Sequence, residues 1–157
     1  MNTKSKTTWS IWVLPGLWCC LLGFAGCEPD LRDDPIPPGN FPDQVLNLNL
    51  PEFLPLKTDG GIASLANIGV RGVLVYRKNA TTYLVFERNC SFQPANACAT
   101  VDVHSSSLFL VDNCCNSSFR FEDGEPTGGP AWRPLRIYQS YVDGFNLTIT
   151  SDSANGM

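Results

Sequence analysis

Short runs of β-branched and aromatic residues, separated by turn residues, limit the fold of this chain more than any other feature. Residues 45–50 alternate apolar and polar side chains, as a half-buried strand does. Other short apolar runs occupy residues 70–76, 82–87, 108–111, 136–142 and 145–150. No window combines a sustained helical period with helix caps. The sequence therefore predicts an all-β domain of antiparallel strands, arranged as a β-sandwich or barrel.

Turn residues indicate how some of these strands are joined. Residues 78–80 lie between two of the runs and predict a hairpin loop. Asp143 and Gly144 separate the last two runs, and an Asp-Gly pair suits a type I′ hairpin turn. Residues 123–134 are rich in glycine and proline and are predicted to form a loop.

The N-terminal segment has the pattern of an export signal. Lys4 and Lys6 precede an uncharged apolar run over residues 9–25, and Gly26 and Cys27 follow it. This ending resembles the bacterial lipobox. The resemblance implies that residues 1–26 are a lipoprotein signal peptide and that Cys27 becomes the acylated N-terminus. Acyl chains hold a protein at a membrane, so we expect a lipid-anchored protein of the cell envelope, at the outer membrane on its periplasmic side or at the cell surface.

Residues 27–40 are predicted to be a tether. Acidic residues and prolines dominate the stretch after Cys27, and such a composition favours an extended chain over a packed one. The acidic stretch also resembles the surface-export signal of lipoproteins from Bacteroidetes-like bacteria. The remaining residues, 41–157, are predicted to form one β domain.

The charge of the chain argues against a nucleic-acid surface. Its 11 lysines and arginines against 15 aspartates and glutamates give a formal net charge of −4, with no cluster of basic residues. Nucleic-acid binding needs a basic stripe or patch. We therefore expect no nucleic-acid partner.

Four cysteines fall in the predicted β domain: Cys90, Cys98, Cys114 and Cys115. An even number of cysteines in an oxidising compartment predicts two disulfides. Partly free thiols are one alternative. A four-thiolate site for zinc or an iron–sulfur cluster is another, but the chain lacks C-x-x-C pairs. Cys114 and Cys115 are also adjacent, and adjacent side chains on an extended backbone point in different directions.

The order of motifs around these cysteines resembles the Rieske 2Fe–2S domain. An apolar hairpin over residues 72–86 leads into Cys90, and Cys114-Cys115 follow about two dozen residues later. A G-G-P-A loop at residues 128–131 comes next, with Pro134-Leu135 three residues on. The resemblance covers residues 43–150 and implies an all-β, Rieske-like fold with two cysteine-bearing loops at one end.

The resemblance does not extend to the ligands of the cluster. A Rieske site reads C-x-H in one loop and C-x-x-H in the other, with two thiolates on one iron and two imidazoles on the other. Cys90 and Cys114 match the thiolate positions, but Phe92 and Ser117 stand at the histidine positions. The only histidine, His104, lies at neither position and is expected to be an ordinary polar residue. We therefore predict a degenerate member of the family that binds no metal; a 2Fe–2S cluster with atypical ligands is the alternative.

The resemblance also implies which cysteines pair. The two thiolate ligands of the family lie close together, which implies a Cys90–Cys114 bridge, and a second family disulfide implies Cys98–Cys115. The crossed alternative is Cys90–Cys115 with Cys98–Cys114.

Two aromatic residues accompany the loops. Phe92 and Trp132 are expected to fill the space of the lost cluster, or to form a small apolar contact patch at the loop tips. The first function hypothesis is thus a non-enzymatic envelope lipoprotein with a structural or partner-binding role, whose partner is an unidentified envelope protein. The second is an electron-transfer protein. The third is a thiol–disulfide protein using Cys114 and Cys115.

Overall fold

The computed structural model describes residues 34–154, so the predicted signal peptide and Cys27 lie outside the described residues. The described part contains ten strands and one short 3₁₀ helix: β1 (Gln44–Asn47), η1 (Pro51–Lys57), β2 (Ile62–Leu65), β3 (Val73–Asn79), β4 (Thr82–Glu87), β5 (Val101–Val103), β6 (Leu110–Asp112), β7 (Ser117–Phe119), β8 (Pro126–Gly128), β9 (Ile137–Asp143) and β10 (Asn146–Ser153). The seven-residue η1 is the only helix in this range, which agrees with the lack of a helical period in the sequence.

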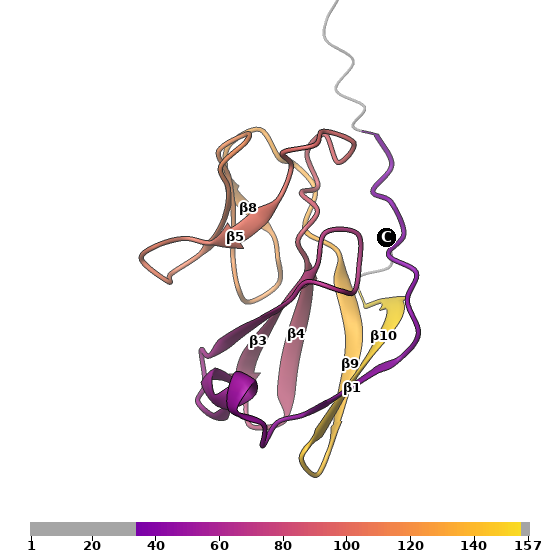
Figure 1. Cartoon of the computed structure of the whole chain (residues 1–157). Helices are drawn as coiled ribbons and strands as arrows, with labels where there is room; N and C mark the ends of the chain where they lie inside the picture. The colour runs from indigo at the N-terminus through magenta and orange to yellow at the C-terminus, as the bar shows by residue number, and fades with distance from the viewer. Residues whose placement is uncertain (1–33, 155–157) are drawn as a thin grey trace, which may run out of the picture. The chain divides into compact units, whose positions relative to one another are not determined.

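The strands form two antiparallel sheets (Figure 1). The larger sheet has the order β1-β10-β9-β4-β3-β2, and the smaller one has the order β5-β6-β7-β8. Every pair of neighbouring strands is antiparallel. The smaller sheet is one continuous stretch of chain inserted between β4 and β9. The predicted all-β, antiparallel fold class is confirmed.

The continuous apolar runs of β3 and β4 arise because both faces of these strands are covered. Val73 and Val75 pack into one core with residues of η1 and β10. Leu74, between them in sequence, points to the opposite face and packs with Phe86 and the residues of the smaller sheet. Successive side chains of a strand alternate between faces, so a strand buried on both sides needs apolar residues at nearly every position.

The last hairpin uses a different turn from the predicted one. Asp143 pairs with Asn146, so Gly144 and Phe145 are the two central residues. Only Gly144 has a positive φ, of 57°. A type I′ turn requires positive φ at both central residues, whereas type II′ requires it only at the first. The residues of the predicted loop 123–134 also include the short strand β8.

The second half of the predicted tether lies against the β domain. Ile36 is buried, and its carbonyl accepts a hydrogen bond of 3.4 Å from Nη2 of Arg136. Nη2 of Arg133 donates to the carbonyl of Asp34 at 3.0 Å. A Cβ built on Gly39 would lie 1.9 Å from the hydroxyl of Tyr138, so only glycine fits this approach. The domain boundary at residue 40 stays a prediction, but residues 34–40 contact the domain.

A buried carboxylate joins the end of β4 to its surroundings. Glu87 has no exposed surface. Its Oε2 accepts hydrogen bonds from the Val70 backbone N–H and the Tyr138 hydroxyl, both at 2.7 Å. Its Oε1 accepts from the backbone N–H groups of Arg71 at 3.0 Å and Asn89 at 2.9 Å. Four donors compensate the desolvation of this carboxylate. They also fix three segments around one point: the loop after β2, strand β9 and the residues just before Cys90.

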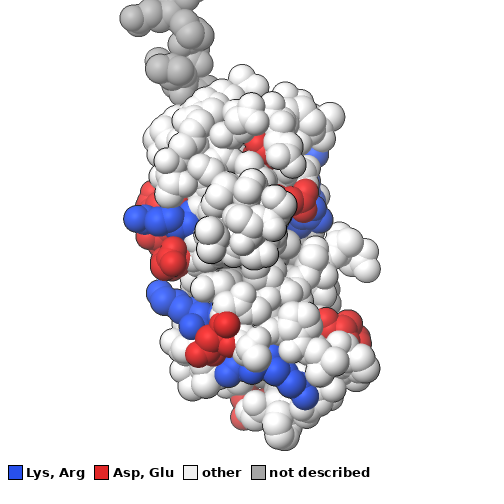
Figure 2. Space-filling view, turned by 90° about the vertical axis from the view of Figure 1, so that its left-hand side faces the viewer, with Lys and Arg blue, Asp and Glu red and all other residues white. Residues whose placement is uncertain are grey.

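The described part contains no candidate membrane helix, and the face shown in Figure 2 has no basic patch. Within residues 34–154, no helix is long and apolar enough to cross a bilayer. On the face shown in Figure 2, basic and acidic side chains lie next to one another and do not gather into a patch of one sign.

We expect Glu87→Gln to lower the free energy of unfolding by roughly 2–4 kcal/mol, because an amide NH₂ would face buried donors in place of an accepting oxygen. Urea unfolding at neutral pH measures this effect. Glu122→Gln, at an exposed position, is the matched control and should change stability by less than about 0.5 kcal/mol. Equal effects of the two variants would contradict the role of Glu87.

Tyr138 should make stability depend on alkaline pH. Burial, followed by its hydrogen bond and proximity to Glu87, raises the pKa of Tyr138 above the ordinary value of 10.0. Because the unfolded chain ionises first, this contribution is complete below pH 10 and is lost as the pH rises from 10 through the folded pKa. Tyr138→Phe should cost about 1–2 kcal/mol at pH 7, and its stability should fall less steeply above pH 10. The control is the exposed residue Tyr141 changed to Phe, which should keep the wild-type slope.

Candidate functional site

Strand pairing brings the two cysteine-bearing loops to the same end of the smaller sheet. Cysteine loop 1 (residues 88–100) leads from β4 into β5, and cysteine loop 2 (residues 113–116) connects β6 to β7. Val101 at the start of β5 pairs with Asp112 at the end of β6. The end of cysteine loop 1 therefore lies beside the start of cysteine loop 2, so both loops are at one end of the sheet, as the resemblance implied.

The disulfide between these loops joins Cys98 and Cys114, whose Cα atoms lie 5.6 Å apart. The implied Cys90–Cys114 and Cys98–Cys115 pairs are wrong, and the Cys98–Cys114 half of the crossed alternative is the one observed. The physical reason is that the turn over residues 113–116 leaves Cys114 exposed and directs Cys115 inward. Cys98 and Cys114 both lie on the exposed side, whereas Cys115 is half-buried and faces the fully buried Cys90.

Cys90 and Cys115 are not bonded to each other, and they form a group with Asp112. The two sulfurs lie 3.9 Å apart. The Cys115 thiol donates toward Oδ2 of Asp112 at 3.4 Å, and the Cys114 backbone N–H donates to Oδ1 at 2.7 Å. One ligand atom from each of Cys90, Asp112 and Cys115 lies within 4.8 Å of the others.

Sequence reasoning missed Asp112, although a signal for it was present. Asp112 and Cys115 are separated by two residues, which is the C-x-x-H spacing. The sequence prediction gave this spacing to Cys114 and Ser117, which are also separated by two residues. The spacing alone permits both choices, and the structure places Asp112 and Cys115 next to Cys90, whereas Cys114 is bonded to Cys98.

The surroundings of Cys90 keep its thiol protonated. Burial is the main cause that raises the pKa of Cys90 above its ordinary value. The hydrogen bond to Asp112 and the negative charge of that carboxylate raise the pKa further. A protonated thiol is a poor nucleophile, so Cys90 is not suited to thiol–disulfide exchange. Cys114, half of the predicted exchange pair Cys114 and Cys115, is already bonded to Cys98.

The other predicted site residues lie in different environments. Phe92 is half-buried and packs against the core cluster that contains Cys90. Trp132 is 62% exposed, and the guanidinium of Arg133 lies 5.3 Å from its ring centroid. His104 stacks on Phe109 at 4.2 Å between ring centroids and is not part of the Cys90–Asp112–Cys115 group. Phe92 thus fills space beside the group, whereas Trp132 remains available for contact.

The G-G-P-A loop packs directly on cysteine loop 2. Ser117 is fully buried; its hydroxyl accepts a hydrogen bond of 3.0 Å from the Ala131 backbone N–H and lies 3.1 Å from the Cys115 sulfur. Gly129 has a φ of 81°, and a Cβ there would lie 2.5 Å from the carbonyl oxygen of Asn116. Glycine is needed here for both its φ and the close backbone contact.

The side chain of Arg71 holds cysteine loop 1 from the other side. Nε of Arg71 donates to Oδ1 of Asn89 at 2.6 Å. Its two Nη atoms donate to the carbonyls of Asn96 at 2.6 Å and Ala97 at 2.5 Å. Together with the disulfide, these bonds fix the loop that carries Cys90.

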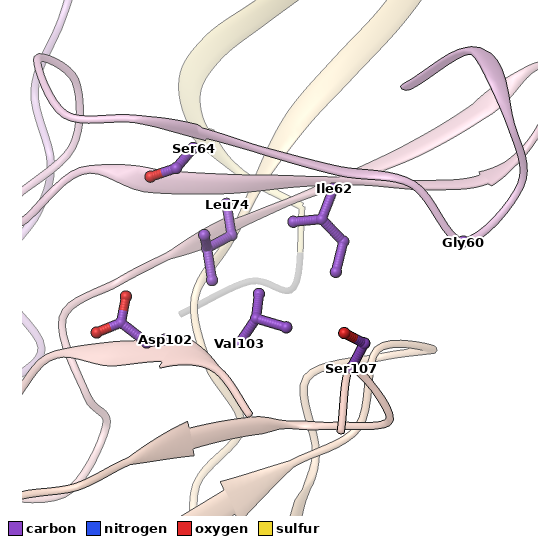
Figure 3. Close-up of a pocket in the computed structure, with 7 residues that line it drawn as sticks. All are labelled: Gly60, Ile62, Ser64, Leu74, Asp102, Val103 and Ser107. Atoms are coloured by element: carbon purple, nitrogen blue, oxygen red, sulfur yellow. The ribbon is translucent and has the colours of Figure 1, made fainter. Parts of the chain in front are cut away.

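An open groove of about 640 Å³ lies between the two sheets (Figure 3). Ile62 and Leu74 of the larger sheet face Val103 of β5 across it. The remaining lining residues are Gly60, Ser64, Asp102 and Ser107. One carboxylate and two hydroxyls are too few polar groups to indicate a reaction, so the cysteine loops remain the candidate site.

Comparison with known proteins gives matches among solved structures alone. No protein-family model and no curated protein matches the sequence. The plasma membrane Rieske protein of the cyanobacterium Synechocystis PCC 6803 has a TM-score of 0.42 and 25% identity, covering 50% of this chain and 76% of that chain. The ferredoxin of carbazole 1,9a-dioxygenase from Nocardioides aromaticivorans IC177 has a TM-score of 0.40 and 20% identity, covering 59% and 86%. A complex of reduced oxygenase and oxidized ferredoxin in carbazole 1,9a-dioxygenase has a TM-score of 0.44 and 17% sequence identity. This match covers 61% of this chain and 85% of that chain.

Loss of the disulfide should destabilise the domain. Cys98 and Cys114 are 16 residues apart, and a closed loop of this size contributes about 3 kcal/mol by restricting the unfolded chain. We expect the Cys98→Ser/Cys114→Ser double variant to lose about this much in urea unfolding. Cys115→Ser, which leaves the bond intact, is the control. Recovery of a Cys90–Cys114 peptide after non-reducing digestion would contradict the pairing.

Proposed function

We propose that this chain is a lipid-anchored, non-enzymatic protein of the bacterial cell envelope. Its Rieske-like β domain carries no 2Fe–2S cluster and has a structural or partner-binding role. The observation that carries the proposal is the donor set between the cysteine loops: Cys90, Asp112 and Cys115. The anchor itself rests on the sequence around Cys27.

This donor set does not fit the cluster that the resemblance implies. A Rieske cluster takes two thiolates on one iron and two imidazoles on the other. Phe92 stands at the position of the first imidazole, and a phenyl ring has no lone pair to donate. His104 is engaged with Phe109 and with the Ser106 hydroxyl, at 2.8 Å from Nδ1. Cys114, the expected second thiolate, belongs to the disulfide.

The rigidity of the loops and one exposed aromatic residue support a binding role. The disulfide and the Arg71 hydrogen bonds hold the loops in one arrangement, and such preorganisation lowers the entropy cost of association. Trp132 lies next to Ala131, which is hydrogen-bonded to Ser117 at the start of β7, and exposes 62% of its surface. Tryptophan is enriched among the residues that dominate protein interfaces. An envelope protein is the partner that the predicted location favours.

The second candidate is an electron-transfer protein with an atypical 2Fe–2S site. The observation in its favour is that Cys90 and Cys115 are free thiols 3.9 Å apart, close to where the family places its cluster. This candidate needs a fourth ligand. The Ser117 hydroxyl, 3.1 Å from the Cys115 sulfur, already accepts the Ala131 N–H.

Iron analysis separates the two candidates. The protein is produced with ample iron and sulfide, and its iron content and visible spectrum are measured. We expect a colourless protein without stoichiometric iron, because the donor set lacks both imidazoles. The matched positive control is the triple variant Phe92→His/Asp112→Cys/Cys115→His, which restores C-x-H and C-x-x-H on the same loops. Two irons per chain in the unaltered protein, with charge-transfer bands in the visible spectrum, would overturn the proposal.

A further inference from the structure

The spacing of Cys90, Asp112 and Cys115 matches the coordination sphere of one metal ion. In a tetrahedral zinc site, with Zn–S about 2.3 Å and Zn–O about 2.0–2.2 Å, two sulfurs lie roughly 3.8 Å apart and a sulfur and an oxygen roughly 3.5 Å apart. The corresponding distances here are 3.9 Å between the two sulfurs and 3.4 Å between the Cys115 sulfur and Oδ2 of Asp112. The third pair, the Cys90 sulfur and an oxygen of Asp112, lies within 4.8 Å, so the three side chains need only small movements to bind a single ion.

The charge of Asp112 gives an independent reason to place a cation here. Its side chain is fully buried, and no ion pair of Asp112 is present within residues 34–154. The Cys114 backbone N–H satisfies Oδ1, but the side-chain donors to Asp112 are thiols: Cys90 hydrogen-bonds this carboxylate, and the Cys115 sulfur, which also lies 3.1 Å from the Ser117 hydroxyl, is 3.4 Å from Oδ2. Thiols are weak hydrogen-bond donors, and a buried carboxylate needs a stronger partner to offset its desolvation. A cation between Oδ2 and the two sulfurs supplies one.

The type of donor selects the class of ion. Two cysteine sulfurs favour thiophilic ions such as Zn²⁺ over Ca²⁺ or Mg²⁺, which prefer sites made of oxygen. Cys90 is fully buried whereas Cys115 is only half-buried, so an ion enters from the side of Cys115. Three protein ligands leave a fourth tetrahedral position open to water or to a group of a partner, as in zinc sites that are not purely structural.

The surrounding structure holds the three ligands before any ion binds. Cys90 lies in cysteine loop 1, which Arg71 and the Cys98–Cys114 disulfide fix. Asp112 ends β6 and is paired with Val101 and Ser117 on its two sides. Because these ligands are already ordered, binding costs little conformational entropy.

We propose that Cys90, Asp112 and Cys115 form a binding site for one thiophilic divalent cation, of which Zn²⁺ is the representative. Binding converts two thiols into thiolates and releases their two protons to solvent, with no change in oxidation state. The alternative, a Cys90–Cys115 disulfide, requires the sulfurs to close from 3.9 Å to about 2.05 Å and needs an oxidant to accept two electrons. The inference goes beyond the proposed function and shares with it only the premise that these thiols hold no 2Fe–2S cluster.

Titration with Co²⁺, followed by competition with Zn²⁺, tests this site in the full chain solubilised in detergent. Cys90 and Cys115 are first shown to be free thiols by alkylation and peptide mapping. We expect one Co²⁺ per chain with thiolate-to-cobalt charge-transfer absorption, displacement by one Zn²⁺, and protection of Cys115 from alkylation. Cys115→Ser and Cys90→Ser should each weaken binding by more than about 100-fold, the loss that removal of an outer-shell partner alone can reach.

His104→Ala is the matched control, because it removes the only imidazole and should bind as the unaltered protein does. Cys115→Ser changes a half-buried side chain and keeps the test decisive if Cys90→Ser does not fold. The inference is overturned if the folded, reduced protein binds neither ion, if both serine variants bind as the unaltered protein does, or if Cys90 and Cys115 are recovered as a disulfide under mild reduction. Two irons per chain would refute the proposed function, whereas a colourless protein that binds no zinc would refute this inference alone.

Discussion

The buried carboxylate of Glu87 is the interaction on which the position of cysteine loop 1 relative to the larger sheet depends. Its two oxygens accept hydrogen bonds from Val70, Arg71, Asn89 and Tyr138. These donors belong to the loop before β3, to the start of cysteine loop 1 and to β9 in the middle of the larger sheet. A buried carboxylate without donors is costly, so these three segments are held to the end of β4 at one point, three residues before Cys90.

A series of contacts leads from Glu87 to the tip of the domain, which carries the cysteine loops. Arg71, whose backbone N–H binds Glu87, uses its side chain to hold the residues around Asn96. The disulfide then joins cysteine loop 1 to cysteine loop 2, and the G-G-P-A loop packs on cysteine loop 2 through Gly129. The result is a preorganised pair of loops in which Cys90 and Cys115 face each other while Cys98 and Cys114 are joined on the outer side.

The donor group at this tip differs from the ligand set of the Rieske motif that the sequence resembles. Phe92 stands at an imidazole position of that motif, and the group between the loops consists of two thiols and one carboxylate. A compact group of two soft donors and one hard donor suits one ion better than two irons. A partner-binding domain with a single cation at its tip and Trp132 beside it is consistent with both proposals.

The sequence by itself determined the all-β class, the approximate position of most long strands and the shortage of histidines, because these depend on local alternation and on composition. It located Thr82–Glu87 as a strand but missed short strands such as Ser117–Phe119, whose residues carry little periodicity. Only the tertiary structure decided that Cys98 pairs with Cys114 and that Asp112 joins Cys90 and Cys115. Those contacts depend on the register of β5 with β6, which sets the direction of each side chain and which no local pattern encodes.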